Sequence, residues 1–69
     1  MGPKLYVEPE EFLKIASQSN NLVIKSRTSR WNGYVGYVVR QGDYYYYTTS
    51  RTPLDLPSTC AIQEVKFIL

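Results

Sequence analysis

The chain has 69 residues, a net charge of +2, one cysteine and no histidine. A chain of this length corresponds to one small domain, so we predict a single domain over residues 1–69. The lone Cys60 excludes a disulfide within the chain, and the lack of histidine excludes the zinc sites built from cysteine and histidine. Without such cross-links the domain needs an aromatic core or a partner, and ten of its residues are Phe, Trp or Tyr.

No segment of the sequence has the character of a signal peptide or of a membrane span. The chain starts with a short mixed segment, and its apolar runs are far shorter than the ~20 residues that cross a bilayer. A single cysteine also gives no sign of a secreted disulfide framework. We therefore expect a cytoplasmic protein that does not associate with membranes.

The positive charge is concentrated in the middle of the chain. Residues 22–51 contain one acidic residue, Asp43, and five cations, which are Lys25, Arg27, Arg30, Arg40 and Arg51. Arginine can contact carboxylates or phosphates through two hydrogen bonds and can stack on aromatic rings. This basic segment is either a solvated strand face or part of a binding surface.

A short strand and a helix are expected at the start of the chain. Residues 5–7 are apolar and aromatic, as in a short strand. Proline suits the first position of a helix, and Glu10 and Glu11 complement the positive end of the helix dipole, so we expect the helix to begin at Pro9. The polar residues 17–21 end it.

The predicted helix has one apolar side. Phe12, Leu13 and Ala16 share a face at helical spacing, and Ile15 lies beside it. A helix of about two turns is marginal in isolation. We therefore expect Phe12 and Leu13 to anchor the helix on a sheet.

The remainder of the sequence predicts further strands. Strands are expected at residues 22–27, 34–40, 44–50 and 61–68. β-Branched and aromatic residues are frequent in these segments, and Gly, Pro, Asn and Asp separate them. The predicted fold class is α+β, with one short N-terminal helix packed on a strongly bent antiparallel sheet of four to five strands.

The spacing of glycines in the second half of the chain resembles that of small SH3-like barrels, including KOW-type modules. Residues 33–38 have the pattern Gly-x-x-Gly-x-Val, in which a glycine lets a strand bend, and Gly42 supplies a hairpin turn. Residues 54–57 match the short helical turn that such barrels place before their last strand. The resemblance covers residues 22–69 and implies a barrel. It does not identify a ligand, because SH3-like barrels bind peptides, RNA, DNA or neighbouring subunits.

The sequence contains no recognisable catalytic motif. Without histidine, neither a Ser-His-Asp nor a Cys-His arrangement can form, and nothing is present to activate Cys60. The glycine-rich phosphate-binding loops are absent, and the carboxylates are scattered along the chain. We predict a protein that is not an enzyme and that has no catalytic, cofactor-binding or metal-binding residues.

The first candidate for binding is Trp31 together with Arg30, in a polar loop before the turn sequence Asn32-Gly33. Tryptophan and arginine are both enriched in binding hot spots. Trp31 is either a core side chain or an exposed anchor. A core role is favoured because so small a domain needs its only tryptophan.

The second candidate is the run of four tyrosines, residues 44–47, with Arg40 and Arg51. A two-residue turn places Arg40 opposite Tyr45 and on the same face as Tyr47, whereas a three-residue turn pairs Arg40 with the other two tyrosines. The sequence leaves both registers open. The candidate binding residues are Arg30, Trp31, Arg40, Tyr45, Tyr47 and Arg51.

These features predict a non-catalytic interaction module, a small protein-binding subunit or adaptor that binds a protein partner or forms a homo-oligomer. Tyrosine and arginine are favoured in such interfaces. The alternative is a single-stranded nucleic-acid-binding domain that uses a basic, tyrosine-rich sheet face on which bases stack. The tyrosines also suit a purely structural role as strand formers.

Overall fold

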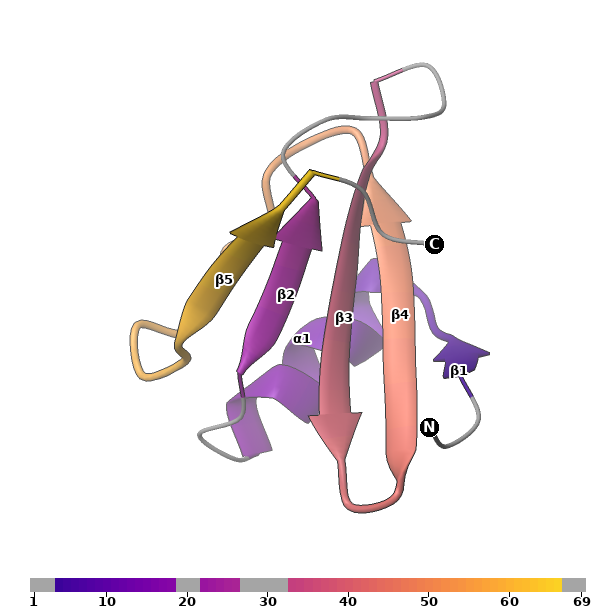
Figure 1. Ribbon diagram of the computed structural model, residues 1–69, viewed down its shortest axis with the longest axis vertical. Helices are drawn as coiled ribbons and strands as arrows, with labels where there is room; N and C mark the ends of the chain where they lie inside the picture. The colour runs from indigo at the N-terminus through magenta and orange to yellow at the C-terminus, as the bar shows by residue number, and fades with distance from the viewer. Residues whose placement is uncertain (1–3, 19–21, 27–32, 67–69) are drawn as a thin grey trace.

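The computed structural model describes residues 4–18, 22–26 and 33–66, and within them the chain forms one helix and five strands. These elements are β1 (Lys4–Tyr6), α1 (Pro9–Gln18), β2 (Val23–Ser26), β3 (Val35–Gln41), β4 (Tyr44–Ser50) and β5 (Ile62–Val65). The strands form one sheet in the order β1-β4-β3-β2-β5, and α1 packs on one side of it (Figure 1). The predicted α+β class, with one short N-terminal helix on the sheet, is confirmed.

The sheet is mixed and is not closed into a barrel. β3 pairs antiparallel with both β2 and β4, whereas β1 runs parallel to β4 and β5 runs parallel to β2. The strand directions make β1 parallel to β2 and β4 parallel to β5, and consecutive parallel strands need a crossover connection. α1 forms the first crossover, and residues 51–61 form the second. The antiparallel arrangement expected from the sequence therefore holds for the three central strands and not for the two edge strands.

The helix begins where the sequence predicts. The Glu8 carbonyl accepts a hydrogen bond from the Phe12 N–H at 2.9 Å, and Pro9 takes the first helical position, where its missing N–H costs no bond. The buried helix residues are Phe12, Ile15 and Ala16. Leu13 is only half-buried, so it lies at the edge of the contact rather than at its centre as expected.

The core lies between α1 and the sheet. The rings of Phe12 and Tyr37 pack with their centroids 6.1 Å apart, and full burial of one such side chain contributes roughly 1.5–3 kcal/mol. The Tyr37 hydroxyl accepts a hydrogen bond from the Leu54 N–H at 3.3 Å, and the buried Cys60 thiol donates to the Ala16 carbonyl at 3.2 Å. These two bonds fix the connection between β4 and β5 to the core.

Residues 54–57 do not form the short helical turn that was expected. The Leu56 N–H donates to the Leu54 carbonyl at 3.0 Å, two residues back, as in a γ-turn. The next turn is closed by the Cys60 N–H and the Pro57 carbonyl, also at 3.0 Å. A proline disfavours the helical conformation of the residue before it, so Pro57 keeps Leu56 out of a helix.

The hairpin between β3 and β4 has a two-residue turn. Gln41 pairs with Tyr44, and Gly42 between them has a φ of 62°, which favours glycine. Arg40 consequently lies opposite Tyr45. Of the two registers that the sequence left open, the structure has the one that places Arg40 on the same face as Tyr45 and Tyr47.

Candidate binding surface

Half of the strand side chains point away from α1, and we call this side of the sheet the outer face. Figure 1 looks onto it, with α1 behind the sheet. Side chains alternate along each strand, and the pairing register shows which residues share a side. Within the described part of the chain, the aromatic and charged residues that the strand pairing places on the outer face are Lys4, Tyr6, Arg40, Tyr45 and Tyr47. Continued alternation just past the ends of β3 and β4 adds Tyr34 and Arg51.

Arg40 and Tyr45 form the pair nearest the hairpin turn. The guanidinium carbon of Arg40 lies 5.9 Å from the centroid of the Tyr45 ring. The Arg40 Nε donates a hydrogen bond to the Gly42 carbonyl at 2.9 Å, which holds the guanidinium beside the turn. Arg40 is exposed and Tyr45 is half-buried, so both groups can meet a partner.

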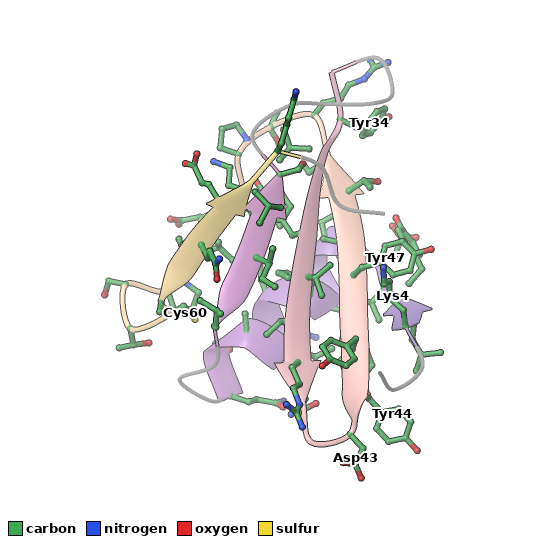
Figure 2. The ribbon with its side chains drawn as sticks, viewed as in Figure 1. Lys4, Tyr34, Asp43, Tyr44, Tyr47 and Cys60 are labelled. Carbon is green, nitrogen blue, oxygen red and sulfur yellow. The ribbon has the colours of Figure 1, made fainter. Side chains whose placement is uncertain are left out.

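Tyr47 lies two residues further along β4 and contacts two side chains of β1. Its ring packs edge to face with that of Tyr6, with centroids 5.3 Å apart and an interplanar angle of 71°. The Lys4 ammonium lies 6.0 Å from the Tyr47 centroid, and Figure 2 shows the two side chains next to each other. The edge strand β1 therefore adds an aromatic ring and a cation to the surface that β4 forms.

Arg51 and Tyr34 form a third pair at the far end of the hairpin. The guanidinium carbon of Arg51 lies 4.9 Å from the Tyr34 centroid, within the range of cation–π attraction. Both side chains are exposed. From Tyr45 to Arg51 the path along β4 is about 20 Å long, at roughly 3.3 Å per residue.

A shallow apolar hollow of about 330 Å³ opens on the outer face beside Arg40 and Tyr45. Its other lining residues are Leu22, Ile24 and Val38. Val38 is buried, whereas Leu22 is 44% exposed. The hollow thus has aliphatic walls with a cation and a phenol next to them, which suits an apolar or aromatic group of a partner.

None of the acidic residues that the structure describes points from a strand to the outer face. Three precede or begin α1, Asp43 is in the hairpin turn, and Asp55 and Glu64 line a second hollow on the helix side of the sheet. That second hollow, of about 440 Å³, also contains Lys25 and therefore has mixed charge. On the described strands of the outer face, the charged side chains are cations.

The structure brings together three of the predicted binding residues, Arg40, Tyr45 and Tyr47. Arg51 is on the same face but at its other end, next to Tyr34. The predicted residues Arg30 and Trp31 lie outside the residues that the structure describes.

Sequence reasoning missed Lys4, Tyr6 and Tyr34. Lys4 and Tyr6 join the surface through the pairing of β1 with β4, which are about forty residues apart. The alternation of Lys4 and Tyr6 around an apolar residue is a weak sign of a two-sided strand, but nothing local indicates its neighbour.

Among the described residues, no group of three or more Cys, Asp or Glu side chains is arranged to hold a metal ion. The helix that the structure describes is too short and too polar to traverse a bilayer. Comparison of the chain with protein-family models, curated proteins and solved structures found no match. Membership of the SH3-like superfamily therefore stays a prediction.

Proposed function

We propose that this chain is a non-catalytic interaction module and that it binds its partner through the outer face. The observation that carries the proposal is the clustering of four tyrosines with Lys4, Arg40 and Arg51 on one side of the sheet. Aromatic and arginine side chains supply much of the binding energy in macromolecular interfaces. Two classes of partner fit this surface.

A protein partner, with the chain acting as a small subunit or adaptor or forming a homo-oligomer, is supported by the hollow beside Arg40 and Tyr45. Interface hot spots are typically pockets in which an apolar or aromatic anchor is surrounded by polar side chains. Leu22 and Ile24 give this hollow the required apolar walls.

A single-stranded nucleic acid is supported by the association of tyrosine rings with cations. Each of the three cation–ring contacts found in the described residues joins a group that can stack on a base to one that can contact a phosphate. The two partner classes use overlapping residues, so the surface as a whole can be tested before its partner is known.

The test is affinity capture from a lysate of the native host, with the full chain as bait. The bait variant is the double substitution Arg40→Ser with Tyr45→Ser. The control bait is Lys14→Ser with Tyr44→Ser, because both of its positions are exposed and lie on α1 and on the helix side of β4. Protein and nucleic acid in the captured material are quantified separately.

We expect the wild-type and control baits to retain the same partner and the Arg40/Tyr45 bait to lose at least nine-tenths of it. Equal melting temperatures of the three baits establish that the loss is not due to unfolding. Capture of the same partner in equal amount by all three baits would contradict the assignment of the outer face.

A further inference from the structure

The cations and rings of the outer face are arranged around β4. Lys4 and Arg40 pair with Tyr45 from the strands on either side of β4, and Arg51 follows the other end of β4. Arg40 lies over Tyr45, Lys4 lies over Tyr47, and Arg51 lies over Tyr34. The first and last of these contacts are about 20 Å apart along the strand. No aspartate or glutamate occurs among the described strand residues of this face.

We infer that the partner of the outer face is a single-stranded nucleic acid, an inference that rests on the proposed function. Three exposed cations, Lys4, Arg40 and Arg51, spread over about 20 Å of one face, are complementary to a chain of phosphates. Aromatic rings beside those cations offer flat surfaces to the bases, and stacking is tolerant of sequence because every base has such a face.

The rings are positioned for stacking rather than closed off in the core. Tyr6 is 48% exposed and Tyr34 is 37% exposed, and Tyr45 and Tyr47 are half-buried. A duplex hides the faces of its bases between neighbouring pairs, whereas a single strand can turn them toward a protein surface. The outer face therefore selects a single strand over a duplex.

The charge pattern favours this partner over a protein. Lysine is depleted in protein–protein interfaces, whereas nucleic-acid interfaces are strongly positive. The outer face contains Lys4 as well as two arginines, all exposed. The apolar hollow beside Tyr45 is compatible with both partners, because a base can also cover aliphatic side chains.

The direct test is fluorescence anisotropy of a labelled oligo-dT of about 15 nucleotides, titrated with the full chain. If Lys4, Arg40 and Arg51 each neutralise one phosphate, log K falls with log salt with a slope of about −2. Affinity is then expected to drop roughly 15–20-fold between about 50 mM and about 200 mM salt.

Substitutions of tyrosine separate stacking from charge. Tyr45→Ala should weaken binding at least about fivefold, because one base loses its stacking partner. Tyr45→Phe keeps the ring and should bind within about twofold of the wild type. Tyr44→Ala, on the opposite side of the same strand, is the matched control and should leave the affinity unchanged.

Three results would overturn the inference. The first is no binding of the oligonucleotide at low salt. The second is equal affinity for the corresponding duplex or for heparin, a polyanion without bases. The third is an unchanged affinity of Tyr45→Ala. Loss of a captured protein by the Arg40/Tyr45 bait, combined with any of these results, would leave the outer face as a protein-binding surface. If one of these results is obtained and the Arg40/Tyr45 bait also captures as much protein as the wild type, then both the proposed outer-face function and the nucleic-acid inference are wrong.

Discussion

Phe12 and Thr48 are both fully buried, yet burial has opposite consequences for their contributions to stability. Phe12 removes a large apolar ring from water and packs it against Tyr37. The Thr48 hydroxyl oxygen is buried without a hydrogen-bond partner among the residues that the structure describes. A buried polar atom without a partner costs about 1–3 kcal/mol. The two side chains therefore give predictions of opposite sign.

Phe12→Ala is expected to lower the free energy of unfolding by about 3 kcal/mol or more, because the ring is completely enclosed between α1 and the sheet. Leu13→Ala should cost clearly less, since Leu13 is only half-buried. Urea denaturation of both variants measures the difference. Equal losses would mean that the helix docks through a different side.

Thr48→Val is expected to raise the free energy of unfolding by about 1 kcal/mol, because a methyl group replaces the unpaired hydroxyl at nearly constant shape. Thr49→Val, on the outer face, is the control and should change stability by less than about 0.5 kcal/mol. Urea denaturation gives both values. A loss of more than about 1 kcal/mol for Thr48→Val would show that the hydroxyl is hydrogen-bonded.

Among the elements, the β3–β4 hairpin determines which side chains form the outer face. Its two-residue turn sets the register that places Arg40 opposite Tyr45. A turn longer by one residue would move Tyr45 and Tyr47 to the helix side. The positive φ of Gly42 is the conformational requirement of this turn.

Gly42→Ala is expected to lower the free energy of unfolding by about 1 kcal/mol, because an L-residue with a side chain is strained at a φ of 62°. A Cβ at this position meets no atom within 4 Å, so the loss reports backbone strain alone. Gly42→Asn should cost less, since asparagine tolerates this conformation better. Urea denaturation compares the three proteins, and identical stabilities would contradict the turn geometry.

The helix and most strands could be predicted from the sequence. Which side chains of each element pack against the rest of the molecule could not. Pro9 and the glutamates after it indicate the helix start, and the β-branched and aromatic segments indicate the strands. The apolar residues 12, 13, 15 and 16 span an arc of about 160° on the helix, wider than the stripe of about 100° that faces a core, so only docking determines which of them are buried. In the same way, the register of the hairpin depended on one residue of turn length.

The position of the edge strand β1 in the sheet completes the outer face. α1 carries the chain from β1 to β2, and the β3–β4 hairpin then brings β4 back beside β1, which contributes Lys4 and Tyr6 to the outer face. Parallel pairing joins segments far apart in the chain, and no local pattern identifies the partner strand. This is why sequence reasoning found the basic, tyrosine-rich segment of the hairpin but not the residues that β1 adds to it.

A single-stranded nucleic acid is the partner that we propose for the outer face. Four of the seven tyrosines lie on this face, Tyr6, Tyr34, Tyr45 and Tyr47, while Tyr37, Tyr44 and Tyr46 point to the other side of the sheet. The seven rings thus provide internal probes and controls in one sample.

The measurement is a nuclear magnetic resonance titration of the full chain, with ¹³C-labelled tyrosine rings, against oligo-dT of about 15 nucleotides. We predict shifts of the ring resonances of the first four tyrosines and constant positions for the other three. Shifts concentrated in Tyr37, Tyr44 and Tyr46, or no shift of any ring at low salt, would contradict the claim.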